Sequence, residues 1–201
     1  SYDIAMLPEL GGGKSPHVVD QAGLEALAKS ANGAAIRRAD GREVTSVAFV
    51  QCAGQRDDSG RHLPYCSGHC CATSIKQAMY FKDANPAVET VVLYSDLRVP
   101  GMGEDFYRRA QDKGVIFTKA KVSAVDAAGE GCTVRFRDLI LDEDVALPAD
   151  LVVLATGQVA NAGIDIDLAD ENPAKAQQVS ILNLDYRQGK DLPQLTHGFS
   201  D

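Results

Sequence analysis

Two features that large functional classes require are missing from this sequence. No apolar run approaches the length needed to cross a bilayer, and the first residues show no signal-peptide pattern. Lys and Arg number 20 against 28 Asp and Glu, giving a formal net charge of −8, and the nearest thing to a basic patch is Arg108 with Arg109. Because phosphate binding depends on clustered Lys and Arg, nucleic acid is disfavoured as the main partner. We therefore expect no direct membrane insertion and no nucleic-acid function.

A phosphate-binding loop is also missing, although one segment comes close to it. Gly13, Lys14 and Ser15 match the last three positions of G-x4-G-K-S, but Pro8 stands where the first glycine belongs. Proline has neither the backbone freedom nor the N–H group that would cradle a phosphate. We interpret the segment as a surface turn that leads into a helix predicted over residues 18–30.

Against these absences stands a concentration of cysteine. Cys52, Cys66, Cys70 and Cys71 follow the spacing C-x13-C-x3-C-C. If the chain after Pro64 is helical, the second and third of them share one helix face about one turn apart, and the fourth lies about a third of a turn away. Four such thiolates can surround an iron–sulfur cluster, whose iron corners are spread widely.

Other interpretations of the four cysteines remain open. A single zinc ion is a tighter target, and zinc knuckles usually space their thiolates by two to four residues. Cys66 and Cys70 could instead form a redox dithiol or a disulfide, or the cysteines could be incidental. Cys132, alone in an apparent strand, is predicted to be a small core residue. Since cluster-forming thiols must stay reduced, a cytoplasmic setting is expected.

The remaining pattern predicts an α/β fold. Buried strands alternate with helices, as in a nucleotide-binding half-domain, and an antiparallel hairpin or meander follows. The strands are expected at residues 44–50, 90–94, 115–118, 150–157 and 179–182, the helices at 67–84 and 103–113, and the meander at 121–148. The first buried strand delivers Cys52 at its carboxyl end, which is where open α/β sheets bind ligands.

The turn after that first strand lacks the glycines of a dinucleotide site. Nucleotide-binding domains carry G-x-G-x-x-G there, but residues 51–57 read Gln-Cys-Ala-Gly-Gln-Arg-Asp. Further on, Ala155-Thr156-Gly157 with Asn161 resembles the A-T-G-x-x-x-N loop of two-dinucleotide-binding flavoproteins, where the chain crosses back into the flavin domain. Cysteine ligation has replaced the phosphate loop in this interpretation.

The segments that carry the cysteines resemble one family closely, that of the HdrA-like iron–sulfur flavoproteins of heterodisulfide reductase. The resemblance covers roughly residues 10–160. It rests on QCAGQRD (51–57), PYCSGHCC (64–71) with IKQA (75–78), YSDLRVPGMGEDFYRRAQDKGV (94–115) and ADLVVLATG (149–157). The resemblance implies that Cys52, Cys66, Cys70 and Cys71 ligate a [4Fe–4S] cluster. It also implies that Ala155, Thr156 and Gly157 contact FAD in the intact protein.

The same resemblance implies a fold class and a division of the chain. We expect an α/β, Rossmann-like half-domain of a thioredoxin reductase-like flavoprotein, with a small antiparallel meander and part of the flavin domain. Residues 1–43 would connect from the flavin domain, residues 44–150 would form the module with the cysteines, and residues 151–201 would return into the flavin domain. Since the sequence begins Ser-Tyr-Asp and stops at THGFSD, we expect a central or C-terminal fragment of a longer polypeptide.

The implied function is electron transfer between FAD and partner subunits in sulfur or disulfide redox metabolism, as part of an oxidoreductase complex. Such a relay needs no bond-making side chain, so no catalytic residue is predicted. The implied partners are other heterodisulfide reductase-like subunits and electron carriers, with a homodimer as a further possibility. The alternatives are an NAD(P)-dependent flavin oxidoreductase domain and a zinc-stabilised docking domain.

Overall fold

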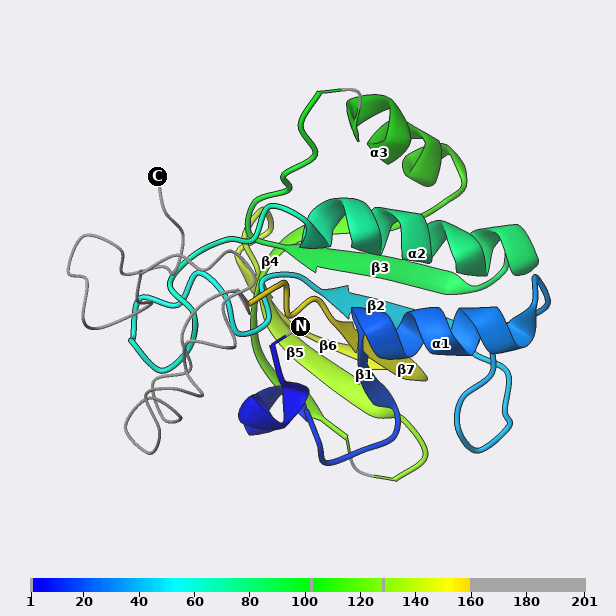
Figure 1. The fold of residues 1–201 in the computed structure, drawn as a ribbon, viewed down its shortest axis with the longest axis horizontal. Helices are drawn as coiled ribbons and strands as arrows, with labels where there is room; N and C mark the ends of the chain where they lie inside the picture. Colours follow the sequence, from blue (N-terminus) through cyan, green and yellow to red (C-terminus); the bar gives the residue numbers. More distant parts are fainter. Residues whose placement is uncertain (1, 102, 128, 160–201) are drawn as a thin grey trace, which may run out of the picture.

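The computed structural model of the protein describes residues 2–101, 103–127 and 129–159, which form one seven-stranded sheet with the order β1-β7-β2-β3-β4-β5-β6 (Figure 1). The strands are β1 (Val18–Asp20), β2 (Ser46–Val50), β3 (Glu89–Tyr94), β4 (Ile116–Asp126), β5 (Cys132–Asp138), β6 (Glu143–Ala149) and β7 (Leu151–Leu154). The helices are α1 (Gln21–Ala31), α2 (Cys70–Ala84) and α3 (Gly103–Asp112), preceded by the short 3-10 helices η1 (Ile4–Met6) and η2 (Pro8–Leu10).

The first five strands in the sheet order pair in parallel, which explains their composition. Neighbouring pairs in this half are parallel throughout, from β1 with β7 to β3 with β4. All four residues of β7 are buried, as are the last four of β2. Continuous apolar runs are required here because a parallel sheet is covered on both faces.

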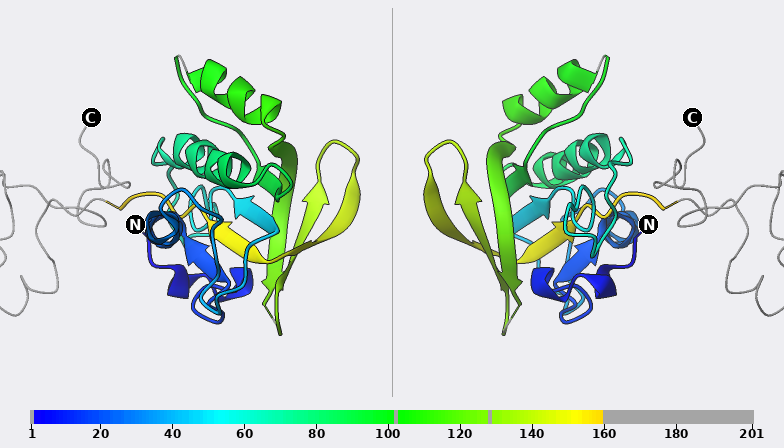
Figure 2. Two further views of the ribbon diagram at one scale, coloured as in Figure 1. Left: turned by 90° about the vertical axis from the view of Figure 1, so that its right-hand side faces the viewer. Right: turned by 90° about the vertical axis from the view of Figure 1, so that its left-hand side faces the viewer.

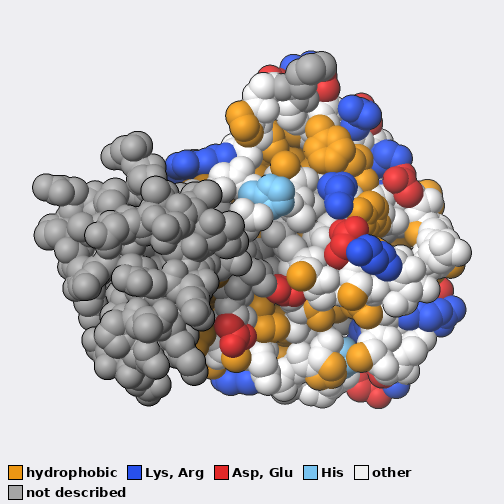
Figure 3. All heavy atoms as spheres, viewed as in Figure 1, with side chains coloured by type: hydrophobic (Ala, Val, Ile, Leu, Met, Phe, Trp, Pro, Cys, Tyr) orange, Lys and Arg blue, Asp and Glu red, His pale blue; other side chains and the backbone are white. Residues whose placement is uncertain are grey.

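One face of the parallel strands packs against the helices. Phe49 of β2 and Phe81 of α2 are almost fully buried and meet edge to face, with ring centroids 6.3 Å apart. Leu24 of α1 and Ala110 of α3 belong to the same core. Figure 2 shows α2 and α3 stacked on this side of the sheet. On the face seen in Figure 3, acidic and basic side chains are interspersed around exposed apolar ones.

The opposite face of the parallel strands is covered by the antiparallel meander β4-β5-β6 and by η2. Val134 and Phe136 of β5 pack there with Val50 of β2 and with Leu10. The meander curves away from the parallel strands on the side opposite the helices (Figure 2). Cys132 lies in this core at 4% exposure, so the prediction of a small buried residue in a strand is confirmed.

Three predicted elements differ from the structure. The first three residues of the helix predicted at 18–30 form β1, because Asp20 caps α1: its carboxylate accepts a hydrogen bond from the Gly23 backbone N–H at 2.7 Å. The apolar start of the chain forms η1 and η2 rather than a strand. The strand predicted at 115–118 continues to Asp126 in β4, which pairs with β3 and then with β5 across a register shift.

A fourth difference concerns the cysteines directly. Helix α2 begins at Cys70, so Cys66 lies in the preceding loop and does not share a helix face with it. The strand predicted at 179–182 and Asn161 lie outside the described residues.

The predicted fold class is confirmed: the chain has an α/β, Rossmann-like parallel sheet with an appended antiparallel meander. Residues 18–31 of the predicted connecting segment contribute β1 and α1 to this sheet domain, and the division of the chain into three parts stays a prediction. None of the helices in the described part of the chain is long and apolar enough to span a membrane.

The contact between Phe49 and Phe81 makes a prediction about stability. Removal of a fully buried aromatic ring leaves a cavity, so Phe81→Ala should lower the free energy of unfolding by about 3–5 kcal/mol. Leu139→Ala, at a side chain that is 45% exposed, should change it little and serves as the control. Chemical denaturation followed by circular dichroism measures both, and a loss below about 1 kcal/mol for Phe81→Ala would contradict the assigned core.

Candidate iron–sulfur site

The candidate site is built on the turn that follows β2. The backbone N–H of Gln51 donates to the Leu93 carbonyl of β3 at 2.9 Å, and the N–H of Ala53 donates to the Ala155 carbonyl after β7 at 3.2 Å. Cys52 lies between these two anchors. The turn is therefore fixed to both strands that flank β2, at the carboxyl edge where α/β sheets bind ligands.

The turn winds through alternating left-handed backbone conformations. Cys52, Gly54 and Arg56 have φ values of 55°, 70° and 56°. At Gly54 a side chain would collide with the Tyr2 ring, whose atoms lie 2.8 Å from an added Cβ. Non-glycine residues rarely adopt this conformation, and such strain persists only where the surroundings determine the backbone. The Cys52 thiol is thus held in place before any ligand arrives.

The loop between the turn and α2 folds back along the turn. The Arg56 N–H donates to the Tyr65 carbonyl at 3.1 Å, and the Leu63 N–H donates to the Gly54 carbonyl at 3.1 Å. Asp57 organises the loop tip, because its carboxylate accepts from Ser59 and from the backbone N–H of His62, and these bonds hold its pKa at about 2. This pairing returns the chain to the turn one residue before Cys66.

Cys70 and Cys71 occupy the first two positions of α2, each 6% exposed. The Cys70 carbonyl accepts a hydrogen bond from the side-chain amide of Gln21 at 2.9 Å, which joins the start of α2 to the start of α1. A helix N-terminus carries a partial positive charge and stabilises thiolates near it. No side-chain cap closes this helix end.

Backbone N–H groups serve two of the four sulfurs. The Gly68 N–H donates to Cys66 Sγ at 3.4 Å. The backbone N–H of Arg98, in the loop after β3, makes a hydrogen bond to Cys71 that favours its thiolate. Such donors are the groups that stabilise anionic sulfur and set the potential of a cluster.

Side chains serve the other two sulfurs. Ser67 Oγ lies 3.4 Å from Cys70 Sγ. The Arg56 guanidinium makes a hydrogen bond to Cys52 and is held by Asp96 Oδ2 at 2.7 Å. Each of the four cysteines therefore has its own hydrogen-bonding neighbour.

Electrostatics place the four thiols in one region. Burial raises the pKa of the Cys52 thiol to about 11, and the charges of Cys71 and Cys66 add to the increase while Arg56 opposes it. Burial likewise raises the pKa values of Cys70 and Cys71, and each of these two also responds to the charge of Cys66. All four thiols are free. Among the described residues, no three His, Cys, Asp or Glu side chains are arranged to hold a single metal ion.

The Ala155-Thr156-Gly157 loop lies directly beside the cysteine turn. Gly157 has a φ of 71°, and an added Cβ would lie 2.0 Å from Gln55 Nε2. Gln55 Oε1 in turn accepts from the Ser67 N–H at 3.2 Å and lies 3.9 Å from Cys70 Sγ. Ala155 and Thr156 are buried, and Gly157 borders an open depression of about 660 Å³ between α1 and α2.

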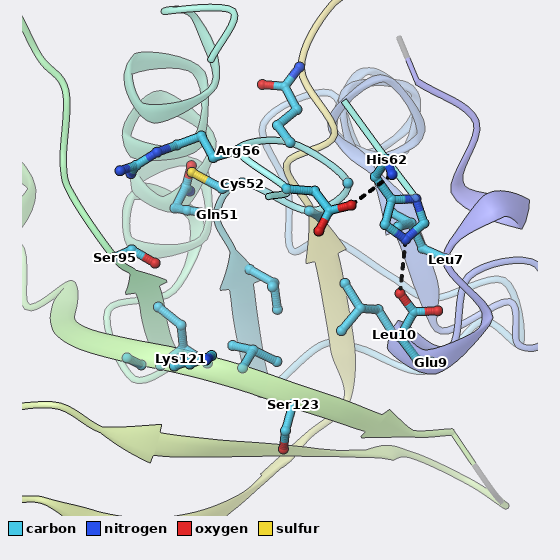
Figure 4. A pocket seen from close by; sticks show the side chains of 18 of the residues that line it. Leu7, Glu9, Leu10, Gln51, Cys52, Arg56, His62, Ser95, Lys121 and Ser123 are labelled. Carbon is cyan, nitrogen blue, oxygen red and sulfur yellow. Dashed lines mark hydrogen bonds and ion pairs between the residues drawn. The ribbon is translucent and has the colours of Figure 1, made fainter. Parts of the chain in front are cut away.

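A cavity of about 420 Å³ lies on the other side of the turn, toward β4 (Figure 4). Cys52 and Arg56 form one end of it, and Lys121 of β4 lies at the other. Gln51 lines the wall with only 7% of its surface exposed, and neither polar atom of its side chain has a partner among the described residues. The two sides of the cysteine turn thus differ: one meets the Ala-Thr-Gly loop, the other this polar cavity.

The structure brings together all seven residues singled out in the sequence as cysteine ligands or flavin contacts. Sequence reasoning considered Arg56 only as a loop ion pair and overlooked Gln55 and Arg98. No local pattern marks these three, because each contributes through a contact that the fold creates. The left-handed Cys52 was also missed, since its neighbours Gln51 and Ala53 give no turn signal.

Together, the parallel sheet, its helices and the cysteine turn define a Rossmann-like half-domain of the kind found in two-dinucleotide-binding flavoproteins, in which four thiols occupy the position of the phosphate loop. Comparisons with known proteins identify the family. The chain is 37% identical over 164 residues to the iron–sulfur HdrA subunit of the CoB–CoM heterodisulfide reductase of Methanocaldococcus jannaschii, covering 78% of this chain and 25% of that protein. It belongs to the HdrA family of heterodisulfide reductase subunits.

A second relative agrees. The corresponding subunit of the H2:CoB-CoM heterodisulfide,ferredoxin reductase of Methanothermobacter marburgensis is 33% identical over 172 residues, which cover 82% of this chain and 26% of the relative. The chain therefore spans about a quarter of the length of these curated relatives. No protein-family model matches the chain.

Among solved structures, similarity is limited to distant flavoproteins. Thioredoxin reductase from T. acidophilum gives a TM-score of 0.42 at 10% identity, covering 75% of this chain and 41% of that one. Ornithine hydroxylase from Pseudomonas aeruginosa gives 0.45 at 13% identity, covering 72% of this chain and 40% of that one.

The raised pKa of Cys52 predicts how the metal-free protein reacts with alkylating reagents. A thiol with a pKa of about 11 in place of 9.0 carries on the order of 100-fold less thiolate at neutral pH, so its alkylation by iodoacetamide should be slow at pH 7 and accelerate as the pH rises toward 11. Mass spectrometry of each cysteine peptide measures the rates. The denatured chain is the control, and rapid labelling of native Cys52 at pH 7 would contradict the burial.

The contact between Gln55 and Gly157 predicts a localised defect. Gly157→Ala should cost about 1–3 kcal/mol from its positive φ alone, with a further loss from the collision with the Gln55 amide. In the double variant Gln55→Ala/Gly157→Ala the collision is removed, so the combined loss should be smaller than the sum of the single losses. Thermal unfolding measures this, and simple additivity would show that the two residues do not interact.

Proposed function

We propose that this chain is the electron-transfer module of an iron–sulfur flavoprotein, in which Cys52, Cys66, Cys70 and Cys71 hold a [4Fe–4S] cluster. The module would relay electrons between FAD and partner subunits or electron carriers in sulfur or disulfide redox metabolism. The observation that carries the proposal is the convergence of four free thiols, each with its own hydrogen-bonding neighbour, at the carboxyl edge of the sheet.

The chemistry of the donor set supports a cluster. Thiolates are the ligands that iron–sulfur clusters use, and N–H groups directed at sulfur are the usual means of tuning them. The site offers both, together with the N-terminus of α2, which favours the negative charge of a thiolate-bound cluster. A cluster held there supplies one-electron transfer.

The residues of the chain would perform three tasks around such a cluster. The strained turn holds Cys52 at a fixed position, and the loop from Arg56 to Tyr65 brings Cys66 to it. Burial of Cys70 and Cys71 keeps water from the sulfurs. Gly68 and Arg98 donate backbone hydrogen bonds that favour the anionic form.

The flavin would lie on the side of the Ala155-Thr156-Gly157 loop. The open depression that reaches Gly157 also borders His69, the residue before the first helical cysteine. A ring bound in the intact protein near this loop would be separated from Cys70 by little more than Gln55. The assignment of Ala155, Thr156 and Gly157 to FAD is part of this proposal.

Anaerobic purification of the full chain tests the cluster. The expected result is a brown protein with about four iron atoms and four sulfides per chain and with broad visible absorption. Replacement of Cys52, Cys66, Cys70 or Cys71 singly by serine should abolish or strongly reduce iron content. Cys132→Ser is the matched control, since this buried cysteine lies in β5, and it should retain the full content.

Three outcomes would count against the proposal. A colourless protein with one zinc per chain would identify a structural metal site instead. A cluster retained at full occupancy in a Cys70→Ser or Cys71→Ser variant would show that the assigned cysteine is not a ligand. Tight binding of NADH or NADPH by the isolated chain would favour the nicotinamide-dependent alternative.

A further inference from the structure

We propose that Arg56 is a positioning residue that raises the midpoint potential of the cluster, and that Asp96 limits this increase. This inference rests on the proposed function, since it concerns a cluster held by the four cysteines. It goes beyond ligation because neither residue carries a sulfur. Together they would determine how readily the site accepts its electron.

Arg56 is held at the site from both ends. Its backbone has a φ of 56° and donates to the Tyr65 carbonyl at 3.1 Å, which fixes where the side chain starts. At the far end, Nη2 lies 2.7 Å from Asp96 Oδ2. Between these anchors the guanidinium makes its hydrogen bond to Cys52, at one end of the cavity in Figure 4.

The geometry gives Arg56 and Asp96 opposite electrostatic effects. Reduction of a [4Fe–4S] cluster by one electron adds one negative charge to the site and involves no bond to either side chain. A fixed cation beside a ligand sulfur stabilises the more negative, reduced form, and a carboxylate that neutralises this cation weakens the effect. The Arg56 side chain is only 31% exposed, so water and salt screen it incompletely.

Other charged groups also face this pair. Lys119 and Arg98 act on Asp96 from β4 and from the loop after β3, and together with Arg56 they favour its ionised form. The guanidinium of Arg98 also acts on Cys71. Arg56 is distinct among these cations in donating a side-chain hydrogen bond to a ligand sulfur.

The test is a redox titration of the anaerobically purified full chain, with dithionite as the electron donor and the reduced cluster followed by electron paramagnetic resonance. Arg56→Gln should shift the midpoint potential to a more negative value, and Asp96→Asn should shift it to a more positive one. Arg56→Lys, which keeps the charge, should restore most of the wild-type potential. Opposite shifts distinguish a charge effect from a packing defect, which would not change sign between the two variants.

A matched ion pair provides the control. Arg108 on α3 pairs with Glu104 at 2.9 Å, with both side chains 67% exposed, and Arg108→Gln should leave the potential unchanged. Iron content is measured for every variant. If the wild type binds no iron, the proposed function fails. If the variants keep full iron content but Arg56→Gln and Asp96→Asn leave the potential unchanged or shift it in one direction, only the inference about Arg56 is overturned. Should Arg56→Gln lose the cluster, the direction of the Asp96→Asn shift alone decides.

Discussion

The position of the whole site depends on two backbone hydrogen bonds that fasten the turn after β2 to its neighbours, from Gln51 to β3 and from Ala53 to the end of β7. Because β2 lies between these strands, the turn cannot move without breaking the sheet edge. The left-handed conformation of Cys52 follows from this confinement. The loop that carries Cys66 and the start of α2 then build on the same turn.

A dinucleotide site uses this turn differently. There, glycines bring backbone N–H groups and a helix N-terminus to an anionic pyrophosphate. In this chain the same edge of the sheet and the same helix end face four thiols. The electrostatic requirement is of the same kind, since thiolates and phosphates are both anions that benefit from N–H donors and a helix dipole. One sheet architecture therefore suits either ligand.

Much of the fold could be predicted from the sequence, because buried parallel strands such as β2 and β7 read as continuous apolar runs. The boundaries were harder. Residues 18–20 fit a helical pattern until the Asp20 cap is known, and β4 hides its change of partner because both halves are strand-like. The cysteines could be found from composition alone. Their donors could not, since Arg56 and Arg98 reach the sulfurs only through tertiary contacts.

The packing of Gln55 has a mechanical consequence. Its amide fills the space where Gly157 lacks a side chain, and its oxygen holds Ser67 beside Cys70. Any displacement of the chain at Gly157, such as that caused by a molecule docking against the loop, would press on this rigid side chain and alter the hydrogen bond at one sulfur. Occupancy on the loop side would therefore be communicated to the thiol side through a single glutamine, without movement of the sheet.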